Sequence, residues 1–206
     1  MSERPDPKLD KILSAARAAF LEHGFAATSM DLIAQTARVS KTTLYTRFPS
    51  KEALFAATVE TECRRSGMHF APEAFDDVPL DEALRRIGLR FLALLWSPGA
   101  MRLRQMVTGE AARFPELAEI FCSSGPDRGC DAVARFFARA VAQRRLPSTG
   151  FDPAFLGGQF MAALKGRLDW DLSFGRRPVP TEEERERHVR AAVALFLRGL
   201  GTEIRT

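Results

Sequence analysis

Residues 28–51 read TSMDLIAQTARVSKTTLYTRFPSK, a stretch that predicts two short helices joined by a tight turn. Thr28-Ser29 can cap a first helix through Ala37, and Ser40 can cap a second one that ends near Arg47. Apolar residues recur where they can hold both helices against their neighbours, namely Ile33, Ala34, Ala37, Val39, Leu44 and Phe48. The stretch therefore predicts a compact two-helix unit.

The second helix of this unit carries side chains that suit DNA. Its polar positions are Lys41, Thr42, Thr43, Tyr45 and Thr46. A helix fits the major groove, where hydroxyl and ammonium groups can meet base edges, and flanking Lys, Thr and Tyr can bind phosphates. No acidic residue lies between Thr36 and Lys51, and the basic residues there are Arg38, Lys41, Arg47 and Lys51. From these residues alone, a solvated connector helix is the alternative interpretation.

Helical patterns flank the unit and continue along the chain. Apolar residues between Leu9 and His23 recur at three- and four-residue intervals, and Gly24 closes that stripe. Pro49-Ser50 breaks the chain and caps a longer helix from Lys51 to about Arg65. Further helical segments are predicted over residues 80–95, 101–112, 115–123, 133–147, 152–172 and 181–200. No alternating strand pattern occurs, so the predicted fold class is all-α.

Length and composition exclude several classes of protein. The 206 residues allow one to two domains, and 46% hydrophobic with 27% charged residues is ordinary for a globular chain. The longest apolar run, residues 191–197, is far shorter than the roughly twenty residues that cross a membrane. The charged N-terminus lacks an apolar signal core, and three cysteines without C-x-x-C spacing suit a reducing compartment. We therefore expect a cytoplasmic protein without a membrane partner.

A set of motifs runs through residues 20–54. These motifs are Phe20-x-x-x-Gly24-Phe25, Thr28-Ser29-Met30, Ile33-Ala34, Ala37-x-Val39-Ser40, Thr43-Leu44-Tyr45, Phe48 and Lys51-x-x-Leu54. Together they resemble the TetR family of bacterial transcriptional regulators. The resemblance implies an N-terminal helix-turn-helix DNA-binding domain over residues 1–65. It also implies a C-terminal helical domain over residues 66–206 that binds an effector and forms a dimer.

The resemblance implies roles for individual residues of the two-helix unit. The residues on the helix that would enter the major groove are Ser40, Lys41, Thr42, Thr43 and Thr46. Those that would contact phosphates are Thr28, Ser29, Tyr45 and Lys51. Lys41 is the candidate for base readout, because a long donor can reach O6 and N7 of guanine. Lys51→Ala would weaken binding to all DNA sequences alike and lower the salt slope by about one unit.

Arg38 departs from the family pattern, which usually has glycine in this turn. A turn that needs a positive φ would make arginine cost on the order of 1 kcal/mol. The sequence therefore leaves two interpretations of Arg38 open, a strained turn or an added phosphate contact.

Motif matching is much weaker after residue 65, as in a variable sensor domain of this family. The resemblance implies a ligand cavity among these helices without choosing its residues. Aromatic and methionine side chains that could line it are Phe91, Trp96, Met101, Met106, Phe121, Phe137, Met161 and Trp170. An ordinary hydrophobic core is the alternative interpretation for each of them.

The last two helices are the predicted dimer interface. Gly157-Gly158 would allow close approach of a helix pair, and the apolar stripe over residues 189–200 is broad enough for a partner. Two-fold symmetry doubles the contacts of a short recognition helix on a palindrome, and family members similarly dimerise through their last two helices. In a monomer, these two helices would instead cover each other.

No sequence feature indicates catalysis, a cofactor or a metal site. The three histidines, His23, His69 and His188, are scattered, and no H-E-x-x-H, glycine-rich phosphate loop or nucleophile elbow occurs. The sequence thus predicts a homodimeric repressor, not an enzyme, that binds a palindromic operator in double-stranded DNA and leaves it on binding a small hydrophobic effector. Two alternatives stay open. One is a DNA-binding protein of the same fold without an effector, and the other is a helical ligand-binding protein whose basic patch is incidental.

Overall fold

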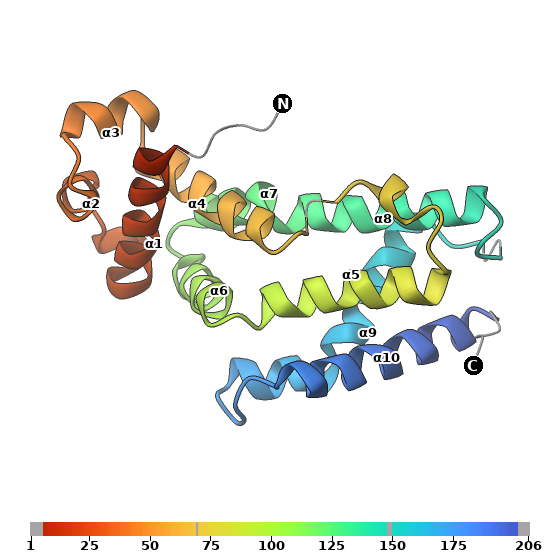
Figure 1. The fold of residues 1–206 in the computed structure, drawn as a ribbon. Coiled ribbons are helices and arrows are strands. Elements are labelled where there is room, and N and C mark those ends of the chain that lie inside the picture. The colour runs from red at the N-terminus through yellow and green to blue at the C-terminus, as the bar shows by residue number, and fades with distance from the viewer. Residues whose placement is uncertain (1–5, 69, 148–149, 202–206) are drawn as a thin grey trace. The chain divides into compact units, whose positions relative to one another are not determined.

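The computed structural model describes residues 6–68, 70–147 and 150–201, and their regular structure is helical (Figure 1). The elements are α1 (Pro7–Ala27), α2 (Met30–Ala37), α3 (Lys41–Arg47), α4 (Lys51–Arg65), the 3-10 helix η1 (Pro72–Phe75), α5 (Leu80–Leu95), α6 (Pro98–Glu110), α7 (Pro115–Ser124), α8 (Pro126–Ala142), α9 (Pro153–Ser173) and α10 (Glu182–Gly199). No strand occurs in the described ranges, and the all-α prediction is confirmed. Helices α6 and α8 begin earlier than predicted, because proline is tolerated in the first helical turn.

Packing divides the helices into two compact units. The first consists of the chain up to Glu62 together with Pro98–Pro126, and the second of Cys63–Ser97 together with the chain from Asp127 onward. In the first unit, α1 packs against α2 and α6, and α6 contacts α7. Helices α6 and α7 therefore belong with the N-terminal helices, although they follow residue 65. The functional division into residues 1–65 and 66–206 stays a prediction.

An aromatic cluster fills the centre of the first unit. Phe20 and Phe25 of α1 stack with 5.7 Å between their ring centroids. Phe55 of α4 meets both rings edge-on, at 5.2 and 5.5 Å. All three side chains are buried. Because Phe25 directly follows a break in α1 at Gly24, this cluster fixes the last turn of α1 against α4.

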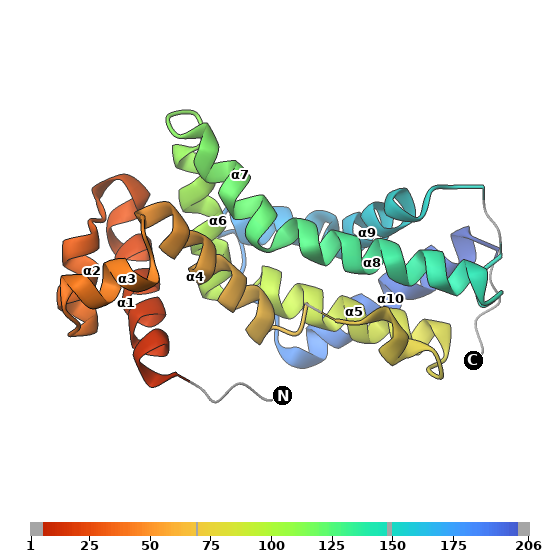
Figure 2. The same ribbon diagram turned by 90° about the horizontal axis from the view of Figure 1, so that it is seen from above.

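In the second unit, α5 and α10 lie side by side and α9 contacts both (Figure 1, Figure 2). Gly88 permits this approach, since a Cβ atom there would lie 3.0 Å from the side chains of Leu164 and Val189. Gly166 interrupts α9 with a φ of 49°, which the predicted continuous helix over residues 152–172 did not foresee. Near this break, Nε2 of His188 lies 2.6 Å from the carbonyl oxygen of Leu164.

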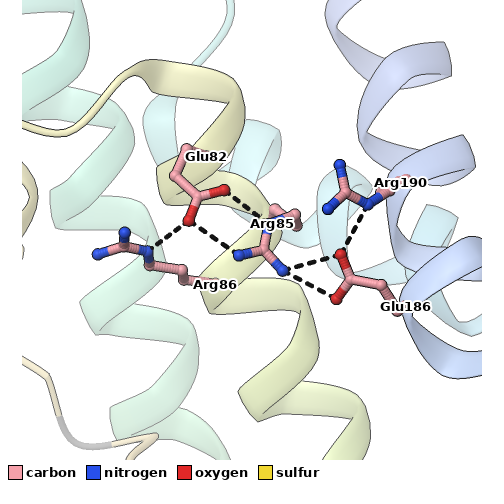
Figure 3. A network of polar contacts seen from close by, with 5 residues as sticks. All are labelled: Glu82, Arg85, Arg86, Glu186 and Arg190. Carbon is pink, nitrogen blue, oxygen red and sulfur yellow. Dashed lines mark hydrogen bonds and ion pairs between the residues drawn. The ribbon is translucent and has the colours of Figure 1, made fainter. Parts of the chain in front are cut away.

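A network of charged side chains joins α5 to α10 (Figure 3). Arg85 Nη1 donates to both carboxylate oxygens of Glu186 at 2.8 Å, and its Nε donates to Glu82 at 2.6 Å. Arg86 also binds Glu82, and Arg190 also binds Glu186. The hydrogen bond from Arg85 lowers the pKa of Glu82 from 4.5 to about 2. Arg85 and Glu186 therefore link α5 to α10, and the lowered pKa of Glu82 makes the part of the network within α5 pH-dependent.

We expect Arg85→Met to lower the free energy of unfolding by about 1–2 kcal/mol near neutral pH, since Glu82 and Glu186 lose a shared donor. The folded-state pKa of Glu82 lies below its unfolded value. Its contribution to stability is therefore complete above pH 4.5 and is lost as the pH falls through about 2. Urea denaturation at about pH 6.5 and about pH 3.5 should show a smaller difference between variant and wild type at the lower pH.

The matched control for Arg85 is Arg187→Met, which removes an exposed i,i+4 pair with Glu183 on α10. That pair is exposed on both sides, so its loss should cost under about 0.5 kcal/mol. A difference between Arg85→Met and wild type that did not change with pH would contradict the role of Glu82.

Candidate nucleic-acid interface

Helix α3 presents one polar face to solvent. Leu44 is fully buried, and Phe48, just after the end of α3, is buried as well. The exposed residues are Lys41, Thr42, Tyr45, Thr46 and Arg47, and Thr43 is half-buried. Tyr45 is 48% exposed although it is aromatic. Helix α3 is therefore anchored by its apolar side and offers ammonium, hydroxyl and phenol groups on the other.

Serine side chains cap both short helices. Ser29 Oγ accepts a hydrogen bond from the Leu32 N–H at 3.1 Å at the start of α2. Ser40 Oγ accepts from the Thr43 N–H at 3.1 Å at the start of α3, and it lies 2.8 Å from Thr43 Oγ1. Each cap satisfies a backbone donor that the helix leaves unpaired. Both helices therefore begin where the sequence predicts.

The turn between α2 and α3 is left-handed at Arg38, with φ 55° and ψ 45°. The Arg38 N–H donates to the carbonyl of Gln35, and the Val39 N–H donates to that of Ala34, both at 3.1 Å. This pair of bonds forms a Schellman motif, in which glycine is the usual left-handed residue. The position therefore has the positive φ that the sequence analysis considered, and the arginine side chain is exposed.

We expect Arg38→Gly to raise the free energy of unfolding by about 1 kcal/mol, because glycine adopts a positive φ without steric cost. If Arg38 contacts a phosphate, the salt dependence of DNA binding should also have a slope about one unit lower in the variant. Urea unfolding and DNA titrations at several salt concentrations measure the two effects separately. Arg38→Ala is the matched control, since it loses the same charge and keeps the strained backbone. Equal stability of the two variants would contradict the strain.

Two exposed cations of the interface are paired with carboxylates. Lys41 Nζ lies 2.6 Å from Asp31 Oδ2, and Arg47 Nη2 lies 2.7 Å from Asp6 Oδ2. The Lys41 pair is exposed on both sides, and such pairs contribute under about 1 kcal/mol. A phosphate or a base edge can therefore replace the carboxylate. The sequence does not predict these pairs, because both acids lie outside the basic stretch between Thr36 and Lys51.

The side chains of Thr28 and Lys51 do not fit the predicted phosphate contacts. Thr28 is 2% exposed, and its hydroxyl lies 2.7 Å from the carbonyl oxygen of Gly24. Lys51 Nζ donates to the carbonyls of Phe25, Ala26 and Thr28 at 2.7, 3.3 and 3.0 Å. An ammonium group has three N–H donors, and these contacts occupy all of them. Both side chains therefore stabilise the end of α1, and the salt-slope change expected for Lys51→Ala does not follow from this geometry.

The eight residues predicted for a ligand cavity divide between the two compact units. Those in the first unit are Met101, Met106 and Phe121, all half-buried. Those in the second are Phe91, Trp96, Phe137, Met161 and Trp170. Trp96, Phe137 and Met161 are buried, so their part in a ligand cavity stays a prediction. Trp170 is 66% exposed and stacks on Phe174, so it lies on the surface and not in an enclosed cavity.

The second unit has a surface groove of about 330 Å³ that contains none of these eight residues. Its lining residues are Phe70, Ala71, Arg128, Asp131, Ala132 and Arg135.

Within the described ranges, no three His, Cys, Asp or Glu side chains form a group that could hold a metal ion, and His69 lies outside those ranges. The described part of the chain also contains no helix that is long and apolar enough to cross a membrane.

Two protein families match long segments of the chain. A family described as bacterial regulatory proteins, tetR family, matches residues 12–58, which contain both α2 and α3. A family described as AefR-like transcriptional repressor, C-terminal domain, matches residues 82–201. The chain belongs to the TetR family. Helices α2 and α3 are thus the helix-turn-helix of a DNA-binding transcriptional regulator, which confirms the predicted resemblance.

Solved structures of TetR-family proteins are similar over nearly the whole chain. Flavonoid-responsive Regulator FrrA is 36% identical with a TM-score of 0.75, over 93% of this chain and 96% of that one. A TetR-family regulator from Mesorhizobium loti is 28% identical, with the same TM-score and coverage. HTH-type transcriptional regulator UidR from Escherichia coli K12 is 39% identical over 70 residues, which are 34% of this chain and only 36% of UidR. These relatives are transcriptional regulators.

Proposed function

We propose that this TetR-family chain is a homodimeric repressor that a small hydrophobic effector releases from a palindromic operator. The observation that carries the proposal is the exposed polar face of α3, which Leu44 anchors from its buried side. A repressing role is supported by the description of the C-terminal family, whose members are AefR-like transcriptional repressors. Such a regulator acts on DNA in the cytoplasm.

In this proposal the residues that face the major groove are Ser40, Lys41, Thr42, Thr43 and Thr46. Lys41 reads guanine, after it exchanges the carboxylate of Asp31 for O6 and N7 of the base. The residues that contact phosphates are Ser29, Arg38 and Tyr45. Each of these three side chains is exposed at or beside the helix-turn-helix, as a phosphate contact requires.

A second copy of the chain covers the apolar surface of α9 and α10. The large hydrophobic side chains exposed on these helices are Phe155, Trp170 and Leu195, and Phe151 and Phe174 are exposed just beyond the two ends of α9. Surfaces of this kind mark interaction sites, and a two-fold dimer presents two α3 helices to the two halves of a palindrome. The dimer therefore accounts both for the exposed aromatic residues and for recognition by a short helix.

The effector binds the C-terminal domain, residues 66–206, and favours a conformation with a different separation of the two α3 helices. It can shift this equilibrium only by its difference in affinity for the two conformations. FrrA is named as flavonoid-responsive and is 36% identical over nearly the whole chain. We therefore infer a flat, hydrophobic, aromatic molecule as the effector.

Selection from a random duplex library by the full-length wild type tests the proposal. We expect the enriched sequences to be palindromic, with half-sites about one helical turn or a multiple of it apart. Sedimentation should give a dimer, and a panel of flavonoids and other hydrophobic aromatics should include a compound that releases the selected duplex. A chain that enriched no sequence would not be a DNA-binding regulator of this kind, and a duplex that no compound released would favour a regulator without an effector.

A further inference from the structure

Helix α1 is interrupted at Gly24, whose φ of 78° and ψ of 171° are not helical. After this break, the N–H groups of Phe25 and Ala26 donate to the carboxylate of Glu110, at 3.0 Å to Oε1 and 3.1 Å to Oε2. Glu110 is the last residue of α6 and lies more than eighty residues further along the chain. One carboxylate therefore binds two consecutive backbone amides, each through a charge-assisted hydrogen bond.

The carbonyl side of the same segment is bound by a charge of the opposite sign. Lys51 Nζ donates to the carbonyls of Phe25, Ala26 and Thr28, and it lies 4.3 Å from the centre of the Phe25 ring. The Phe25 ring is buried, and the Phe114 ring packs against it at 6.3 Å. Residues 25–28 are thus held between an acid from α6 and a base from α4.

This segment leads directly into the DNA-binding helices. Ser29, the cap of α2, follows Thr28 in the chain, and the turn at Arg38 joins α2 to α3. The position of residues 25–28 therefore sets where α2 begins and how α3 is oriented towards DNA. We propose that Glu110 is a positioning residue for operator recognition, acting through the backbone amides of Phe25 and Ala26. This inference rests on the proposed function, since it concerns the same DNA-binding site.

Glu110 lies well outside residues 12–58, the segment that the N-terminal family matches. Operator recognition would thus depend on a residue that the helix-turn-helix segment does not contain. The geometry also gives a second reason, besides the backbone conformation, why position 24 requires glycine. A Cβ atom at Gly24 would lie 2.5 Å from Oε1 of Glu110, so a side chain there would displace the carboxylate.

The test compares Glu110→Ala and Glu110→Gln in the full-length chain, with the duplex selected by the wild type and with a random duplex. Glutamine keeps one acceptor oxygen and turns a donor towards the other amide, so it should retain part of the effect. We expect operator affinity to fall about tenfold or more in Glu110→Ala and by less in Glu110→Gln. Affinity for random DNA should stay within about twofold, because non-specific binding depends on charge and not on helix position.

The control is Glu116→Ala, which removes the same charge from an exposed position of α7 in the same compact unit. Amide hydrogen exchange of Phe25 and Ala26 should become faster in both Glu110 variants and not in the control. Circular dichroism shows which variants are folded at the assay temperature. If Glu110→Ala is unfolded, the operator affinity of Glu110→Gln tests the inference.

Operator affinity within about twofold of the wild type in folded Glu110→Ala, or in Glu110→Gln where Glu110→Ala is unfolded, would overturn the inference, even with a lowered melting temperature, since the role would then be purely structural. An equal loss for operator and random DNA would overturn it too. These results are distinct from a failure of the proposed function, in which the wild type itself would enrich no duplex.

Discussion

Replacing Gly24 with alanine is expected to lower the free energy of unfolding by about 2–4 kcal/mol, a large effect for the addition of one methyl group. Two causes add. The φ of 78° and ψ of 171° lie in a region that essentially only glycine occupies, which costs an L-residue about 1–3 kcal/mol. The new Cβ atom would also lie 2.5 Å from Glu110 Oε1. Glu110 must then shift, which weakens its hydrogen bonds to the amides of Phe25 and Ala26.

Gly109→Ala is the matched control for this prediction. Gly109 lies next to Glu110, has no heavy atom within 4 Å of the position of an added Cβ, and is helical. Alanine should therefore raise stability there by about 0.5–1 kcal/mol, through the better helix propensity of alanine. Urea unfolding of the two variants should give opposite signs. A Gly24→Ala variant as stable as the wild type would show that the break in α1 is not required.

The sequence predicts the helix-turn-helix well because its signals are local. The caps at Ser29 and Ser40 depend on residues three positions away, and the buried position of Leu44 follows from the apolar spacing within one short helix. The left-handed turn at Arg38 could be anticipated only as a departure from a family pattern, since arginine itself gives no signal of a positive φ. The two-helix unit and its exposed face are therefore local properties of residues 28–51.

The contacts that hold this unit in place are not local, so residue types along the chain do not predict them. Lys51 has a charge and a position that suit a phosphate contact, yet its three donors bind carbonyls more than twenty residues earlier in the chain. Glu110 gave no signal at all, because its partners are backbone amides 84 and 85 residues away. An amide carries no sequence information, so a side chain that binds one cannot be found from residue types.

The candidate ligand residues were beyond prediction for a related reason. Apolar and aromatic residues look alike in a core, in a cavity and on a covered surface. Trp96 and Trp170 show the difference, since the first is 1% exposed and the second 66%. Trp170 instead belongs to the exposed apolar residues of α9 and α10, from which the dimer is proposed. The position of Trp170 is therefore relevant to the proposed dimer and gives no support to an enclosed ligand cavity.

Replacing Leu195 of α10 with glutamate is expected to convert the proposed dimer into monomers and to lower operator affinity about a hundredfold or more. Leu195 is 73% exposed, so the substitution should change the stability of a single chain by less than about 0.5 kcal/mol. In the proposed dimer the partner removes water from the same position, and burying an unpaired carboxylate there costs several kcal/mol. Each monomer would then hold only half of the palindrome and would lose the avidity of two linked α3 helices.

Sedimentation and operator titration of the same Leu195→Glu sample measure both effects. An added carboxylate also repels DNA, so Thr108→Glu, at an exposed position of α6, is the control for charge alone. Only the Leu195 variant should dissociate, because only its new charge lies among the exposed apolar residues of α9 and α10. Should Leu195→Glu remain dimeric with wild-type affinity for the operator, the second copy must contact a different surface. The exposed aromatic residues Phe155 and Trp170 would then need another partner.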